Sequence, residues 1–339
     1  MRSGRALPGG SKGVGFVTRS QRGMRWVLAV AMGAATVSGT NAPANAIYRP
    51  FEPTSYWNTM LPTDAPIHPD SAQILQFLRV DNDTNYIRLA GTTDSGEWGM
   101  PIYWPGDRAP IYDIGRNCPV DQPPEFNKVR IPSRARPDPT NDAAMTIVDR
   151  IHGVVYGLQH ARYDRATDRW TSCGGTVYYL GSNGLHGDLR ASDDPRNRGH
   201  RGVPPTVWAV RYAEVLAGSI DHVLKIAVHR TGCRHVFPMV EDECGSTNPY
   251  APPEGTRIRI RPNVDLTQLH LSPAALVIAR ALKRYGAIIA DQSGGPVTLK
   301  VENLVAEGRG FLWRGVLRPF SLQHIPLRYF EVIAPGYRP

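Results

Sequence analysis

Two segments of the chain combine groups that can transfer protons with groups that can bind an anion. The candidates in the first segment are Tyr156, Gln159, His160, Arg162 and Tyr163, and those in the second are His222 and Lys225. An imidazole or a phenol can act as a general base or acid, whereas an amide, guanidinium or ammonium group can neutralise a carboxylate. These are the parts needed to eliminate a leaving oxygen from a uronic acid.

We assign catalytic roles to His160, His222, Asp291 and Tyr156, and substrate-binding roles to Arg162, Lys225 and Gln159. If residues 153 to 163 are extended, His160 shares a face with Tyr156, and Gln159 points the other way. Only one of these two neighbours can then line a given groove. We favour His160 over Gln159, with a surface position for His160 as the equal alternative.

His222 alternates with Leu224, Ile226 and Val228, so it shares their face of a predicted strand. That face is either the core or the floor of a groove. The simpler alternative is a buried histidine bonded to a carboxylate. Asp291 follows a strand-like run and could orient such a histidine, although an aspartate there is more often a turn former. The catalytic hypothesis places His160, His222 and Asp291 at one groove.

Other kinds of catalytic site find little support. Outside the predicted leader, the sequence has no G-x-S-x-G, H-E-x-x-H, P-loop or Rossmann glycine pattern, and no E-x-D-x-x-E strand of a two-carboxylate glycosidase. Glu241 and Glu243 lie between two cysteines and are interpreted as a solvated loop. Tryptophans in a β domain are more often core residues than sugar platforms. The ones considered are Trp57, Trp98, Trp104 and Trp170.

The N-terminus has the pattern of a secretory signal peptide. Residues 1 to 46 carry basic residues and no acidic one, then a short apolar run, and they end on Ala44-Asn45-Ala46. The alternative of a membrane anchor needs about 20 apolar residues, and this run is shorter. We predict cleavage before Ile47, a mature chain of 293 residues, and a secreted, extracellular protein without stable membrane insertion.

Removing the leader also changes the charge. It takes away six of the 39 basic residues and none of the 30 acidic ones, so the net charge falls from +9 to +3. The strong basicity that favours nucleic acid is therefore mostly lost.

Four cysteines remain in the predicted mature chain, an even number in an oxidising compartment. Four cysteines allow three pairings. Cys233 and Cys244 are close in sequence and suit a bridge at a hairpin end, which leaves Cys118 with Cys173. The chain has no C-x-x-C pair of the kind that binds zinc. Neither a metal nor another cofactor is therefore expected.

The elements that would position these residues are mainly strands. The strand-like runs are 86–89, 144–148, 153–158, 174–180, 222–228, 256–260, 287–290, 297–301 and 329–333. Arg257 to Arg261 alternates with isoleucine, which predicts one face in the core and one in water. We expect one mainly β domain over 47–339, an antiparallel sandwich of jelly-roll type with one or two short helices.

Two helices are predicted. Ser272-Pro273 begins the first, Leu276, Ala279 and Leu282 form its apolar stripe, and Gly286 follows its end. Asp70-Ser71 begins a shorter one through Leu78. Residues 105–142 and 182–205 look like long loops, which in a compact domain are functional or mobile.

Several segments carry a resemblance to a family. They are Tyr56 to Pro66 with Pro69 to Ser71, Ala217 to Leu224, and Leu271 to Asp291. On these segments the chain resembles a family of secreted, mainly actinobacterial proteins. The family resembles jelly-roll or lectin-like polysaccharide lyases and glycan-binding domains, an analogy of fold that does not transfer chemistry. Its Asp-Gly-His-Met block is Asp142-Ala143-Ala144-Met145 here, so the histidine is absent, and Gln159-His160 replaces Trp-Gln.

The sequence thus favours a carbohydrate-active protein, most plausibly a polysaccharide lyase on an extracellular acidic glycan. A non-catalytic protein that binds a glycan or the cell wall is the first alternative, and the missing histidine favours it. A structural or interaction protein at the cell surface is the second.

Overall fold

The computed structural model describes residues 49–339, apart from the side chain of His200. The predicted signal peptide, residues 1–46, lies outside the described residues. Within 49–339, no helix is long and apolar enough to cross a bilayer. The mainly β prediction is confirmed, because residues 49–339 form several sheets and only three α-helices.

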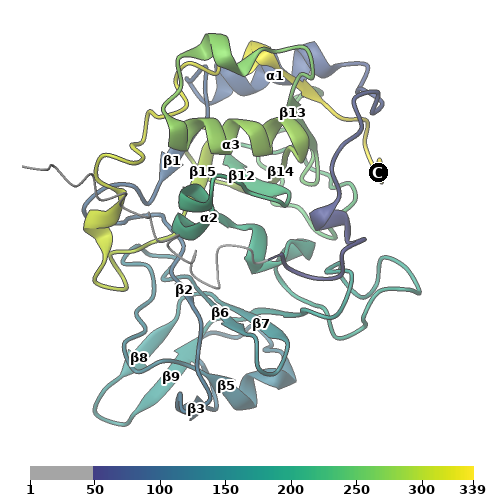
Figure 1. Ribbon diagram of the computed structural model, residues 1–339. Coiled ribbons are helices and arrows are strands. Elements are labelled where there is room, and N and C mark those ends of the chain that lie inside the picture. The colour runs from purple at the N-terminus through teal and green to yellow at the C-terminus, as the bar shows by residue number, and fades with distance from the viewer. Residues whose placement is uncertain (1–48) are drawn as a thin grey trace, which may run out of the picture. The chain divides into compact units, whose positions relative to one another are not determined.

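The largest sheet has seven strands, in the order β1, β15, β12, β14, β13, β16, with β11 also paired to β15 (Figure 1). The strands are β1 (Arg88–Ala90), β11 (Ala209–Val210), β12 (Leu224–Val228), β13 (Arg257–Ile260), β14 (Ala287–Gln292), β15 (Thr298–Val301) and β16 (Phe330–Val332). All of them except β11 fall within or overlap the predicted runs.

The other sheets are smaller. One has the order β10, β7, β6, β2, another has β4, β9, β8, and a third pairs β3 with β5. Their strands are β2 (Ile102–Tyr103), β3 (Ile111–Tyr112), β4 (Gly115–Arg116), β5 (Val129–Arg130), β6 (Met145–Asp149), β7 (Val154–Leu158), β8 (Arg162–Asp164), β9 (Arg169–Ser172) and β10 (Gly175–Tyr179). Residues 105–142, expected as one long loop, therefore contain three of these short strands.

The expectation of purely antiparallel sheets is wrong. In the largest sheet β12 runs parallel to β14, and β1 and β11 run parallel to β15, alongside antiparallel pairs. Parallel neighbours need a crossover connection. The chain supplies it between β12 and β14 through β13 and helix α3 (Pro273–Arg284). Sequence periodicity reports which residues are buried in a strand, not which way its neighbour runs, so this feature was not predictable from it.

Helices α1 (Ser71–Asp81) and α3 cover one face of the largest sheet. Figure 1 shows α3 lying over the strands of this sheet, and one apolar cluster joins both helices to it. The hydroxyl of Ser272 accepts a hydrogen bond from the Ala275 N–H (3.2 Å), which confirms the predicted helix start. Ala279 and Leu282 are fully buried and Leu276 is half-buried, so the predicted stripe faces the core.

A second apolar cluster lies between the largest sheet and the four-stranded sheet. It joins Val148 and Val155 of β6 and β7 to Ile288 and Ala290 of β14. The other face of the four-stranded sheet contacts the short strands of the two smallest sheets through a third apolar cluster. The arrangement therefore has several layers.

The alternating segment of β13 departs from its predicted environment, because its arginine face is also buried. The Arg257 guanidinium donates to the carbonyl oxygen of Tyr285, with Nε at 2.8 Å. The Arg259 Nε donates to Glu331 Oε1 at 2.7 Å. Buried guanidinium groups are tolerated where carbonyl and carboxylate oxygens satisfy them. The alternation marks two faces, but both belong to the interior.

Both predicted disulfides are confirmed, Cys118 with Cys173 and Cys233 with Cys244. Replacing Cys118 and Cys173 with serine is expected to lower the free energy of unfolding by about 2–4 kcal/mol, because the unfolded chain regains a long loop. The loop closed by Cys233 and Cys244 spans 11 residues rather than 55. Its removal is expected to cost less. Urea titration of the two double variants gives the comparison, and equal costs would contradict the loop-length argument.

Helix α2 (Tyr212–Ala217) precedes β12 and was not predicted. Its first N–H donates to Glu302 Oε2 (2.8 Å), just beyond β15. Burial raises the pKa of Glu302 to about 7, with the Glu307 carboxylate adding to the shift and the Tyr212 N–H opposing it.

This shift predicts a pH dependence. Between the ordinary glutamate pKa and about 7, Glu302 is ionised when unfolded and protonated when folded, so the free energy of unfolding falls as pH rises. Glu302→Gln, which stays neutral, is expected to flatten this decline by on the order of 2–3 kcal/mol. Denaturant titrations at pH 5 and 8 measure the difference, and an unchanged slope would contradict the assignment.

Candidate functional site

A cavity of about 620 Å³ opens on the face of the largest sheet that lies opposite α3. Its floor comes from alternate residues of three neighbouring strands. These are Arg88 and Ala90 of β1, Thr298 and Lys300 of β15, and Lys225 and Ala227 of β12.

The period of the strands explains this polar floor. Leu299 of β15 and Ile226 of β12 pack in the apolar cluster beneath the helices. Successive side chains of a strand point to opposite faces, so Lys300 and Lys225 point into the cavity. A lysine in each of two otherwise apolar strands is the sequence signal for this floor.

A β-bulge brings Asp291 to the cavity. Ile226 pairs with Ile289, but Val228 pairs with Gln292, so β14 has one extra residue over this step. Without the extra residue Asp291 would share the face of Ile289, in the cluster under the helices. Bulges often re-aim a side chain beside a functional site. Here the bulge turns the Asp291 carboxylate towards β12.

Asp291 and Lys225 form an ion pair. Lys225 Nζ lies 2.8 Å from Asp291 Oδ2 and 4.8 Å from the ring centroid of Trp208. The lysine is almost fully buried. The Asp291 carboxylate and the Trp208 ring face both attract the ammonium group.

Arg201 enters the cavity from the long loop before β11. Its Nη2 lies 2.7 Å from Glu243 Oε1, and its Nη1 lies 3.9 Å from Glu254 Oε2 and 4.0 Å from Asp291 Oδ1. Burial raises the pKa of Glu254 to about 8, against the opposing charge of Arg201. At neutral pH Glu254 therefore keeps its proton, and Glu243 is the main counter-ion of Arg201.

Glu243 is not the solvated residue expected from sequence. Besides the contact with Arg201, its Oε2 accepts the N–H of Gln292 at 2.6 Å. The neighbouring Cys244 is joined to Cys233, which anchors this turn beside β14. Glu241, in contrast, is exposed as predicted.

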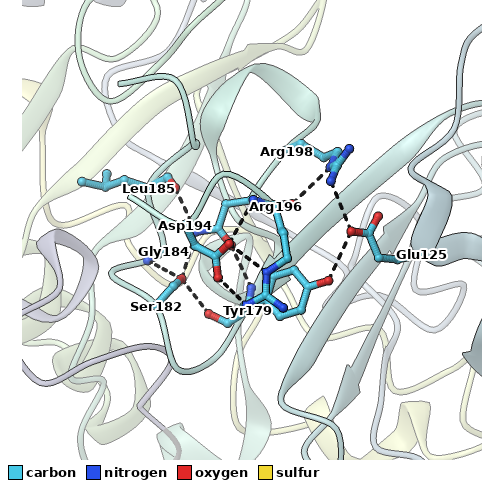
Figure 2. A network of polar contacts seen from close by, with 9 residues as sticks. Glu125, Tyr179, Ser182, Gly184, Leu185, Asp194, Arg196 and Arg198 are labelled. Carbon is cyan, nitrogen blue, oxygen red and sulfur yellow. Dashed lines mark hydrogen bonds and ion pairs between the residues drawn. The ribbon is translucent and has the colours of Figure 1, made fainter. Parts of the chain in front are cut away.

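Polar contacts fix the loop that leads to Arg201 (Figure 2). The Tyr179 hydroxyl and the Arg198 guanidinium both donate to Glu125 Oε1, each at 3.2 Å. The Arg196 guanidinium stacks 3.7 Å from the Tyr179 ring centroid and makes a two-point bond to Asp194. These contacts tie the loop to β10, so Arg201 has a defined position.

Two other cations at the floor have no counter-ion among residues 49–339. Lys300 has no hydrogen-bond or ion-pair partner there, and the Arg88 guanidinium only approaches the Phe320 ring, at 5.2 Å. Burial lowers the pKa of Lys300, and the nearby charge of Lys225 lowers it further. An ammonium or amine and a guanidinium thus face the cavity with their donors available.

Trp98 lines the cavity with a large exposed aromatic surface. Its side chain is 47% exposed, and its backbone has a left-handed φ of 62°. A non-glycine residue in that region is uncommon, and such strain is often found at functional sites. Trp57 and Trp170, two other candidate platforms, are buried, and Trp104 is half-buried.

Of the residues assigned from sequence, the structure brings Lys225, Gln159 and Asp291 together around the cavity. Asp291 contacts Lys225, whereas the expected role was to orient a histidine.

His160 does not line this cavity, because β7 ends at Leu158 before the expected extension to Tyr163. His160 has a left-handed φ of 47°, its side chain is exposed, and its Nδ1 lies 2.8 Å from the carbonyl oxygen of Asn141. The preference for His160 over Gln159 at the groove is therefore wrong.

His222 is a buried core histidine, the simpler of the two alternatives. It is 1% exposed, with Nε2 3.0 Å from Glu214 Oε1 and Nδ1 2.8 Å from the carbonyl oxygen of Val223. The carboxylate that orients it is Glu214, in α2. The expectation that His160 and His222 share a groove is wrong.

The last two candidates lie elsewhere. Tyr156 is buried in the third cluster, and burial and the Asp149 carboxylate raise its pKa to about 12. Arg162 is exposed on β8. Neither residue reaches the cavity.

Lys300, Arg88, Arg201 and Trp98 were not assigned from sequence. The charged residues within apolar strands could have indicated Lys300 and Arg88. Arg201 was not identifiable, because its place depends on how the preceding loop folds.

No group of three or more histidine, cysteine, aspartate or glutamate residues within 49–339 could hold a metal ion. Comparison with protein-family models, curated proteins and solved structures finds no significant match to this chain.

Proposed function

We propose that this chain is a secreted, carbohydrate-active protein that cleaves an extracellular acidic glycan by β-elimination in the cavity on the largest sheet. The observation that carries the proposal is the pairing of the Arg88 guanidinium, which has no carboxylate partner within 49–339, with an exposed tryptophan at the same cavity. The guanidinium suits a carboxylate, and the indole suits the apolar face of a sugar ring.

The carboxylate of a uronic acid needs a fixed cation, because elimination builds negative charge on it. Arg88 is suited to this task, since its guanidinium has no carboxylate partner within 49–339 and can bind both carboxylate oxygens. Arg201, in contrast, is already paired with Glu243.

The two disulfides support an oxidising compartment for the folded chain. The jelly-roll arrangement of the lyases that the sequence resembles is not required by the proposal. The cavity stands on a mixed sheet whose face opposite the helices carries the polar residues.

The test is a panel of acidic and neutral polysaccharides, with ultraviolet absorbance reporting unsaturated ends and calorimetry reporting binding. We expect cleavage of a uronic-acid polymer and none of a neutral glucan. Arg88→Met is expected to lower turnover by about 10²–10³-fold, the loss typical of a removed charge-stabilising donor. Arg108→Met, at an exposed turn, is the matched control.

Trp98→Ala is expected to weaken binding about tenfold, or ~1.4 kcal/mol, whereas the exposed Phe311→Ala should leave it unchanged. Binding without unsaturated ends would identify a non-catalytic glycan-binding protein instead. Neither binding nor cleavage across the panel would overturn the proposal and favour a surface interaction role.

A further inference from the structure

We infer that Lys300 is a neutral amine that removes the proton in this elimination, and that Lys225 is a positioning residue whose fixed charge keeps it neutral. The catalytic half of this inference rests on the proposed function. The inference that the Lys300 amine is neutral does not depend on the proposed function.

The pairing of β12 with β15 brings the two lysines together. Ile226 pairs with Leu299, and both residues face the helices. Lys225 and Lys300 each lie one residue from this pair, so both point to the opposite face. Both line the same cavity.

The two ammonium groups differ in their partners. Lys225 has the Asp291 carboxylate at 2.8 Å and the Trp208 ring at 4.8 Å, which stabilise its charge. Lys300 has neither a hydrogen bond nor an ion pair among the described residues. When two cations share a poorly solvated site, the one without a counter-ion loses its proton first.

Burial and several charged groups act on the Lys300 amine. Burial is the largest influence and lowers its pKa, followed by Lys225 on β12. The carboxylates of Asp291, Asp142 and Asp138 act in the opposite direction, but the net shift is downward. Arg88 on β1 adds a further positive charge at the floor.

The reaction balances without a co-reactant. The amine takes the proton from the carbon that bears the carboxylate, while Arg88 holds that carboxylate. The C–H electron pair forms a carbon–carbon double bond, and the bond to the glycosidic oxygen breaks. The leaving oxygen takes its proton from the Lys300 ammonium, which returns to the neutral amine.

The first test needs no substrate. Trace acetylation with acetic anhydride across a pH series, read by mass spectrometry, follows each lysine as it becomes a free amine. Lys128 is exposed and serves as the internal control. We expect Lys300 to reach half of its maximal labelling at a lower pH than Lys128, with a several-fold greater fractional labelling at pH 7.

Two variants test the role of Lys225. Lys225→Met is expected to move the labelling midpoint of Lys300 upward, whereas Lys225→Arg, which keeps the charge, is expected to preserve it. A Lys300 midpoint equal to that of Lys128 in the unmodified protein would overturn the inference whether or not these variants fold.

Turnover separates the two claims. Lys300→Arg places a permanently charged guanidinium at this position, which cannot lose a proton in the protein, so it is expected to abolish cleavage and retain glycan binding. Normal cleavage by this variant would assign the base elsewhere. A low labelling midpoint in a protein that cleaves no glycan would support the neutral amine and overturn its catalytic role together with the proposed function.

Discussion

Glu214→Ala is expected to lower the free energy of unfolding by about 3–5 kcal/mol, the cost of removing one partner from a buried ionic group. Glu214 Oε1 lies 2.6 Å from Arg211 Nη2 and 3.0 Å from His222 Nε2. All three side chains are buried. The variant leaves a guanidinium and an imidazole without their carboxylate.

Urea titration at pH 7 measures this loss, with exposed Glu241→Ala as the control, expected to change stability by less than about 0.5 kcal/mol. A similarly small loss for Glu214→Ala would show that Arg211 and His222 do not need this carboxylate to stay buried in the folded protein. His222→Ala should also lower the melting temperature, as expected for a structural histidine.

The contacts of Glu214 with His222 and Arg211 also predict a contribution to the free energy of unfolding that is lost in acid. Burial alone would raise the pKa of Glu214, but His222 and Arg211 outweigh it and lower the pKa to about 2. A carboxyl with a lowered folded pKa stabilises the fold above its ordinary pKa, and this stabilisation is lost as pH falls towards 2. The Glu214→Ala penalty should therefore shrink between about pH 4.5 and pH 2.

Leu282→Ala is expected to cost about 3–5 kcal/mol, because Leu282 is 0% exposed in the cluster between α3 and the largest sheet. The loss combines the missing apolar burial with the cavity left behind. The side chains around Leu282 are fixed on α3 and on the largest sheet, so they cannot move far enough to fill the cavity completely.

Leu216→Ala gives the matched comparison, since this helical leucine is 60% exposed and should change stability by less than about 0.5 kcal/mol. Melting curves and urea titrations of both variants decide the result. Equal effects would mean that the helix stripe does not form the core.

Local patterns predicted the elements well. The serine cap and apolar spacing at Ser272, and the apolar spacing after Asp70, predicted two helices at their observed places, although the Asp70 side chain makes no capping hydrogen bond. Short β-branched runs bounded by glycine or proline gave the main strands, and cysteine spacing gave both disulfides. Apart from the pairing of Cys118 with Cys173, which follows by elimination once Cys233 is joined to Cys244, these signals involve residues close together in the chain, so a single sequence is enough to identify them.

The site was harder to predict from the sequence, because it depends on contacts between residues that are far apart in the chain. Asp291 reaches the cavity through a bulge that involves the pairing of two strands. His160 misses it because β7 ends two residues earlier. Arg201 depends on the whole loop held by Glu125 and Tyr179. None of these outcomes follows from residue type or spacing alone.

The alternation in β15 has a consequence for the tolerance of this protein to mutation. Leu299 and Val301 belong to the core under the helices, whereas Thr298 and Lys300 face the cavity. Changes at the first pair should reduce the amount of folded protein in a cell. Changes at the second pair should leave abundance intact and act on the cavity alone, so the cavity can diverge while its scaffold is retained.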